Sequence, residues 1–231
     1  MDELSRRTAA YLAAVDEIAY RIRRSARARR VRVSVDVRDG VEVVLPPRAG
    51  RHDAAQAMAE LRPWVERRLR ALAQAARELG RSDRAVPYLG EQLELVVQTG
   101  RTRVARRGDR LLVPAADHGA ALERWYRRRA RAEVEPRLER AVRRAGTRYT
   151  SLQIRGQRTR WASCSANGAM SFNWRLLLAP AEVLDYVVEH EVVHLDVLDH
   201  SERFWATLAA RCPDWRRHEG WLRRHGHALR L

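Results

Sequence analysis

The chain has 231 residues, a net charge of +16 and an isoelectric point near 11.3. Charges interrupt its N-terminus, and no apolar run approaches the roughly 18 residues that a membrane span needs, so we expect a soluble, cytoplasmic protein without a secretory signal. Only Cys164 and Cys212 are present, which argues against a disulfide scaffold or a cysteine metal site.

The positive charge has two interpretations. All 45 basic residues are arginines, because the sequence contains no lysine. Arginine binds phosphate well and a basic field attracts polyanions, which favours a nucleic-acid partner. The arginines are spread over the whole chain instead of forming one tail, which favours an ordinary solvated surface.

The first half of the chain alternates between strand and helix patterns. Apolar residues at every second position in residues 18–45 predict three antiparallel strands, with a hairpin turn at Asp39-Gly40. Steps of three and four in residues 52–79 predict a helix, and Pro63 predicts the start of a second one. Residues 86–114 return to a strand pattern.

The second half predicts a helix over residues 120–145 and a strand pair over 151–178, with its turn around residues 166–168. A helix after Pro180, another near residues 201–211 and a short one around Trp221 complete the chain. The sequence therefore predicts an α+β protein. An antiparallel, β-rich accessory part would occupy residues 1–116, and a catalytic part residues 117–231.

The motif H-E-x-x-H lies inside the helix that follows Pro180. His190 and His194 are four residues apart, so a helix places both on one face, where they can bind one metal ion. His200 follows the helix and is placed to return as a third ligand. Three histidine ligands leave a fourth position for water, and Glu191 would be the general base. The alternative is a histidine pair on an ordinary helix.

These residue types predict one zinc ion per chain, although manganese or nickel also fits three histidines. Each ligand ring should have a hydrogen-bond acceptor on its free nitrogen. Asp185, Asp196 and Asp199 are candidates, and the sequence does not choose among them.

A long, ordered string of residues surrounds the motif. It consists of residues 160–165 (RWASCS), 173–176 (NWRL), 179–180 (AP), 185–188 (DYVV), 190–194 (HEVVH), 200–201 (HS), 204–205 (FW) and 212–215 (CPDW). In this string the chain resembles the YgjP-like metal-dependent hydrolases, zincin-like proteins related to the SprT-like and WLM metallopeptidases. The resemblance is strongest over residues 152–221 and extends to 22–45 and 87–90.

The resemblance implies a zincin-like catalytic part made of a helix, a β-hairpin, the motif helix and C-terminal helices. It makes His190, His194 and His200 the metal ligands and Glu191 the catalytic base. Two positions depart from the family pattern. Ala162 stands where glycine is usual, and Asp199 where asparagine is common, but neither change removes a ligand or the base.

In zincins an edge strand beside the metal helix holds an extended peptide by strand addition. Residues 158–164 are the candidate strand, with Trp161, Ser163 and Asn173 as candidate substrate-binding residues. Packing and turn support are the alternative roles for these side chains.

Three functions remain open from the sequence. The first is a zinc metallopeptidase that acts on proteins or peptides. The second is a basic nucleic-acid-associated protein whose zinc is structural or whose proteolysis is directed to DNA-bound proteins, as in some SprT-like and WLM proteases. The third is hydrolysis of a non-peptide amide, since activated water attacks either carbonyl. The sequence does not indicate an oligomeric state.

Overall fold

A computed structural model describes residues 18–36, 40–80, 82, 84–157 and 159–231. The chain forms two compact units, one up to residue 83 and the other from residue 84 to residue 229. The first unit combines one described helix with a mixed sheet, and the second combines several helices with two mixed sheets, which confirms the predicted α+β class. The expected border at residues 116 and 117 falls inside the second unit, between a strand and a helix that pack together. The division into an accessory and a catalytic part stays a prediction.

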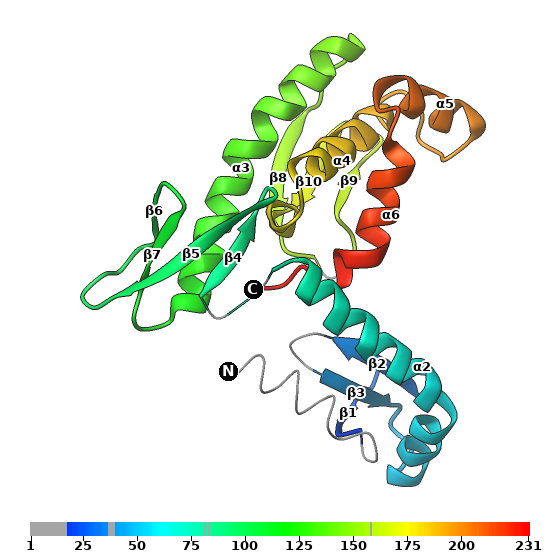
Figure 1. The fold of residues 1–231 in the computed structure, drawn as a ribbon. Coiled ribbons are helices and arrows are strands. Elements are labelled where there is room, and N and C mark those ends of the chain that lie inside the picture. The colour runs from blue at the N-terminus through cyan, green and yellow to red at the C-terminus, as the bar shows by residue number, and fades with distance from the viewer. Residues whose placement is uncertain (1–17, 37–39, 81, 83, 158) are drawn as a thin grey trace. The chain divides into compact units, whose positions relative to one another are not determined.

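The first unit contains one sheet and one long helix (Figure 1). Its elements are β1 (Tyr20–Arg24), β2 (Arg32–Asp36), β3 (Gly40–Leu45) and α2 (Arg51–Glu78). The strand order is β1-β3-β2, in which β2 is antiparallel and β1 is parallel to β3. The expectation of three antiparallel strands was therefore wrong for β1. The most apolar strand, β3, takes the centre, and its two neighbours run in opposite directions because a short connection joins them. Asp39 of the predicted turn lies outside the described residues.

Helix α2 packs its apolar face against this sheet. The core consists of Val33, Val41, Val43, Leu45, Ala54, Met58 and Val65. Pro63 does not start a second helix, because α2 continues through it. Proline removes the hydrogen bond to the carbonyl of Ala59, but both residues are exposed, so water can bond to that carbonyl. The buried positions Met58, Val65 and Leu72 keep the helical spacing across the proline.

The second unit contains two sheets. The first has the order β4-β5-β7-β6 and the second the order β8-β10-β9. The strands are β4 (Ala85–Tyr88), β5 (Glu91–Gln98), β6 (Ala105–Arg107), β7 (Arg110–Pro114), β8 (Ser151–Arg155), β9 (Ala162–Cys164) and β10 (Ala169–Asn173). The helical elements are α3 (His118–Ala145), η1 (Trp174–Leu178), α4 (Ala181–Val193), α5 (Glu202–Arg211), α6 (Trp215–His225) and η2 (Gly226–Ala228). The predicted hairpin turn joins β9 to β10.

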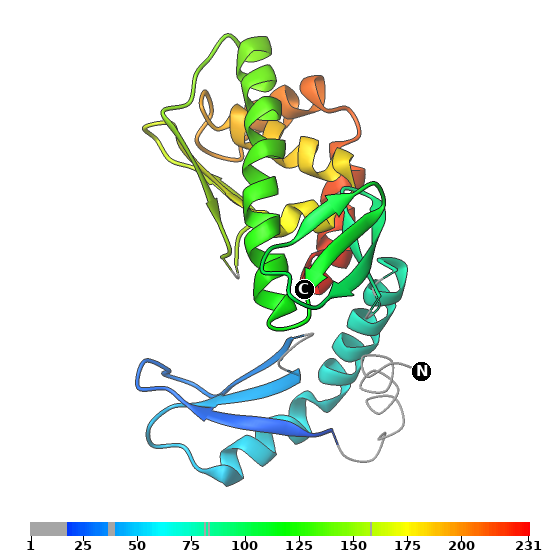
Figure 2. The same cartoon turned by 90° about the vertical axis from the view of Figure 1, so that its left-hand side faces the viewer.

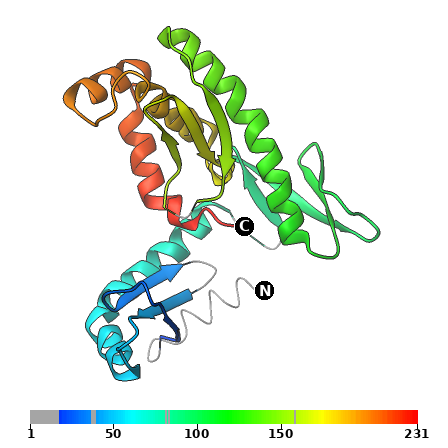
Figure 3. The ribbon, with the colours of Figure 1, turned by 180° about the vertical axis from the view of Figure 1, so that it is seen from behind.

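Helices α3 and α4 pack together on one face of the β8-β10-β9 sheet (Figures 2 and 3). Helix α4 also contacts α5 and α6, so it lies in the interior of the unit. Nine of its thirteen residues are buried, which fits a helix with neighbours on most sides. The motif is thus carried by the most enclosed helix of the unit, and its side chains have little freedom to move.

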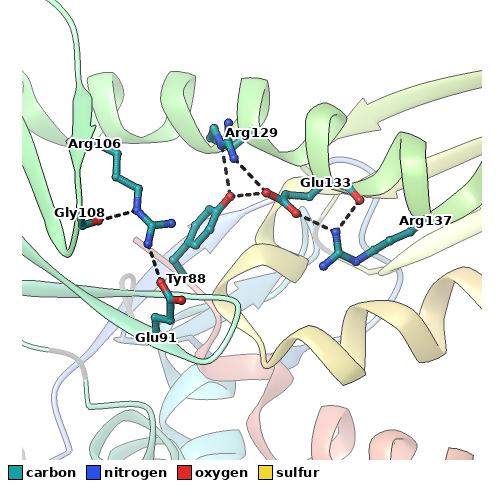
Figure 4. A network of polar contacts seen from close by, with 7 residues as sticks. All are labelled: Tyr88, Glu91, Arg106, Gly108, Arg129, Glu133 and Arg137. Atoms are coloured by element: carbon teal, nitrogen blue, oxygen red, sulfur yellow. Dashed lines mark hydrogen bonds and ion pairs between the residues drawn. The ribbon is translucent and has the colours of Figure 1, made fainter.

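A polar network ties α3 to β4 (Figure 4), and Arg137 extends it to α4. Tyr88 donates its hydroxyl proton to Glu133 Oε1 over 2.9 Å, and Arg129 donates to the same oxygen over 3.0 Å. Arg137 donates to Glu133 Oε2 over 2.7 Å and to Asp185 Oδ1 of α4 over 2.9 Å. Burial by itself would raise the pKa of Glu133. The hydrogen bonds from Arg137 and Tyr88, together with the charges of Arg137 and Arg129, outweigh burial and place that pKa below its usual value.

Replacing Glu133 by glutamine should therefore lower the free energy of unfolding by about 1–2 kcal/mol at pH 7. Since the folded-state pKa is depressed, this contribution is present above the unfolded-state pKa and is lost as pH falls through the folded value. Urea unfolding at pH 7 and near pH 3 measures the difference. Glu139→Gln is the control, because Glu139 is half exposed and lies 4.0 Å from Arg143. Equal effects of the two variants would contradict the role of the network.

Candidate metal centre

Three histidines converge at the C-terminal end of α4. His190 occupies the last turn of the helix, and His194 is the residue that ends it. A five-residue loop then returns the chain to His200, just before α5. Asp199 shapes this return, because its side chain accepts a hydrogen bond of 3.2 Å from the backbone N–H of Ser201, the N-cap of α5. The local fold therefore supplies two rings from one helix and the third from a short loop.

The geometry of the three rings fits a metal ion. One nitrogen from each ring lies within 4.8 Å of the others, and His190 Nε2 is 3.2 Å from His200 Nε2. Tetrahedral ligands at zinc–nitrogen distances of 2.0–2.1 Å lie about 3.3 Å apart. The ring centroids of His194 and His200 are 4.7 Å apart and nearly perpendicular, as expected for side chains that approach a common point from different directions. These residues could therefore hold one metal ion.

The surroundings favour the uncharged form of His190 and His194. Burial, together with the nearby His194 and His200, lowers the pKa of His190 to about 3. Burial also lowers the pKa of His194. Neutral imidazole is the form that binds metal ions, so the ligand set is ready at neutral pH without the loss of a proton from His190 or His194.

Glu191 follows His190 directly in α4 and has one carboxylate oxygen available. The side chain is buried, and the backbone N–H of Cys164 on β9 hydrogen-bonds to it. Burial raises the pKa of Glu191 to about 7, and the Cys164 bond only partly offsets this. Oε2 has no hydrogen-bond partner among the described residues. A carboxylate with a pKa near neutrality, one oxygen anchored and the other without a partner is suited to accept a proton from water.

A family model described as YgjP-like, metallopeptidase domain matches residues 29–225 of the chain. The chain belongs to the YgjP-like family. The match covers both compact units and confirms the resemblance seen in the sequence. It identifies the chain as a member of a metallopeptidase family, whose members are hydrolases that depend on a metal ion. Among curated proteins, none matches this sequence. No helix in the described part of the chain is long and apolar enough to cross a membrane.

In this YgjP-like protein, a backbone carbonyl orients one of the candidate ligand rings. His194 Nδ1 lies 3.0 Å from the carbonyl oxygen of Val197, which directs Nε2 of the same ring to the cluster. The three aspartates considered from the sequence have other contacts. Asp185 pairs with Arg137, Asp196 lies 3.7 Å from Arg211, and the exposed Asp199 accepts a hydrogen bond from Ser201 N just before α5. A sequence pattern cannot reveal a backbone acceptor, because every residue carries one.

The ring of Phe204 packs against the rings of all three histidines. Its side chain is fully buried, and its ring centroid lies 4.8 Å from that of His190, 4.6 Å from His194 and 4.7 Å from His200. Trp205 packs beside His200 at 5.6 Å and stacks on Trp215 at 4.5 Å. The aromatic side chains of α5 thus pack against the three histidine rings and restrict their movement. The sequence marks Phe204 and Trp205 only as part of the family string and does not indicate this contact.

Strand β9 forms an edge of its sheet beside α4, in agreement with the predicted edge strand. It covers Ala162–Cys164 and is shorter than the predicted 158–164; residue 158 lies outside the described residues. Backbone bonds from Asn173 N to Trp161 O (2.7 Å) and from Ser165 N to Ala169 O (3.0 Å) fix the pairing. Since pairing alternates along an antiparallel ladder, the intervening Ala162 and Cys164 direct their N–H and C=O groups away from β10.

The three candidate substrate-binding residues lie on or beside this edge, with different contacts. Ser163 Oγ is 2.9 Å from Ser171 Oγ of β10. The ring of Trp161 packs on Gly226, where an added Cβ atom would lie only 2.8 Å from it. Asn173 is buried, and its amide nitrogen donates to the carbonyls of residues 157 and 160 while its oxygen caps η1. The contacts of Asn173 favour the alternative role of turn support.

Proposed function

We propose that this YgjP-like protein is a zinc-dependent peptidase in which His190, His194 and His200 hold the ion and Glu191 is the general base. The observation that carries this proposal is the convergence of three ring nitrogens within 4.8 Å, at the end of a helix in which the residue after His190 is a buried carboxylate with a pKa near 7. A zinc ion held there supplies a Lewis acid that polarises a carbonyl group and makes a water molecule more acidic.

The protein's own groups account for the remaining chemistry. Glu191 accepts the proton of the attacking water at its free oxygen and passes it to the leaving amine. The backbone N–H of Cys164 holds the other oxygen of Glu191 in place, which couples the base to the edge strand. The outward N–H and C=O groups of Ala162 bind an extended peptide by strand addition. Trp161 and Ser163 flank that strand and are the proposed contacts for substrate side chains.

Removal of the metal tests this function. We expect one zinc ion per chain by ICP-MS and cleavage of casein that stops when a chelator removes the ion and returns when zinc is restored. Manganese and nickel serve as comparison ions. A preparation with full zinc that cleaves no protein or peptide would overturn the peptidase assignment and leave a hydrolase of another amide. A protein that binds no metal would overturn the metal centre itself.

A further inference from the structure

Several arginines lie at one end of the sheet in the first unit. The strands β1 and β3 run in the same direction, and β2 runs back, so the β1–β2 connection and the β3–α2 connection lie at the same end (Figure 2). Two contacts join them: Ser25 N donates to Leu45 O over 2.9 Å, and Arg24 Nη1 donates to the carbonyls of Pro47 and Ala49 over 3.2 and 2.7 Å. Residues 24–32 and 45–53 together are called the arginine end.

The arginine end holds seven exposed arginines and one carboxylate. The arginines are Arg24, Arg27, Arg29, Arg30, Arg32, Arg48 and Arg51. The carboxylate belongs to Asp53, which accepts a 2.6 Å hydrogen bond from Gly50 N and so completes the start of α2. Apart from Arg24, none of the seven forms an ion pair or side-chain hydrogen bond with a residue that the structure describes. By contrast, Arg21 and Arg23 on the neighbouring strand β1 pair with Glu42 of β3.

Unpaired charges of one sign that lie close together repel one another, and a bound polyanion would relieve this repulsion. The N-terminus of the 28-residue helix α2 adds the positive end of its dipole at the same place. The guanidinium group forms paired hydrogen bonds with phosphate oxygens, which lysine cannot do in that geometry. The loop is also held in place, because Val31 packs against the core and Ala28 N bonds to Ser25 O.

We propose that the arginine end binds the phosphate backbone of a double-stranded nucleic acid. Between its arginines, residues 25–30 contain only serine and alanine, so this loop offers no large apolar side chain that could enter a lipid bilayer. The proposal concerns the phosphate backbone alone, and contacts to phosphate do not by themselves distinguish one nucleotide sequence from another. The surface belongs to the first unit alone and does not depend on the metal centre.

Fluorescence anisotropy with a labelled 20-base-pair DNA duplex, titrated from 50 to 300 mM KCl, tests the proposal. The variant R27Q/R29Q/R30Q removes three exposed, unpaired arginines. If each contacts a phosphate, the slope of log K against log salt becomes shallower by about 2.7, and affinity at 100 mM salt falls on the order of 100-fold. R103Q/R107Q/R128Q is the matched control, because it removes the same charge from exposed positions in the second unit.

We expect the control to bind within about threefold of the wild type, and both variants to keep the circular dichroism spectrum and melting temperature of the wild type. Equal losses in the two variants would overturn the proposal, since the general charge would then be responsible. Absence of duplex binding at 50 mM salt would also overturn it. Vesicles of phosphatidylserine and phosphatidylcholine serve as a second probe. Vesicle binding that depends on these three arginines, without duplex binding, would assign the surface to a membrane instead.

Discussion

Glu191→Gln should lower kcat by about 10²–10⁴-fold while the metal content stays unchanged. Glutamine keeps the size and shape of the side chain, and its amide oxygen can still accept the hydrogen bond from Cys164. It cannot take a proton from water, so the loss falls on the chemical step and KM should change little. Steady-state cleavage of casein or a quenched peptide, with ICP-MS on the same preparation, measures both quantities.

Glu189→Gln is the matched control for this experiment. Glu189 lies on the same helix and is also buried, but it pairs with Arg144 of α3 instead of lying beside the histidines. Its replacement should cost stability and leave kcat close to that of the wild type. Undiminished activity of Glu191→Gln would remove Glu191 as the base. Loss of metal from that variant would instead mean that Glu191 helps to hold the ion.

The candidate centre could be predicted from the sequence because its geometry is local. Residues four apart on a helix share a face, so the spacing of His190 and His194 is sufficient to bring their rings together. His200 is only six residues further on, and a short loop leaves few places where it can lie. The edge strand was also predictable, because the hairpin of β9 and β10 is a local structure with a turn at Gly168.

Features that depend on contacts distant in sequence, or on backbone groups, were not predictable. The pattern of β1 identifies a strand but not its neighbour, and its parallel pairing with β3 depends on which strand becomes central. The acceptor for His194 is the carbonyl of Val197, and the donor to Glu191 is the N–H of Cys164. Both are backbone groups that no side-chain pattern distinguishes. The prediction of a helix start at Pro63 was wrong for the opposite reason. The rule that proline ends or starts a helix is local, whereas the burial of the apolar face of α2 on both sides of Pro63 keeps the helix continuous.

His200→Ala should weaken metal binding by more than the 10–100-fold that is typical when only the hydrogen-bond partner of a ligand is lost. His200 is exposed, whereas Phe204 beneath it is fully buried, so the substitution removes a ring without opening the core. The metal-free variant should therefore unfold at nearly the same temperature as the metal-free wild type. Zinc should raise the melting temperature of the wild type far more than that of the variant, because a ligand stabilises the folded state by RT ln(1 + [L]/Kd) and the variant has the larger Kd.

Competition with a fluorescent zinc chelator gives the affinity, and thermal unfolding with and without zinc gives the linked stability. His118→Ala is the control, since His118 is an exposed histidine at the start of α3, outside the cluster. It should bind zinc as tightly as the wild type. If His200→Ala kept that affinity too, the ion would rest on His190, His194 and a different third ligand. If it lost stability even without zinc, the ring would be a packing element, and the cluster would no longer support a metal centre.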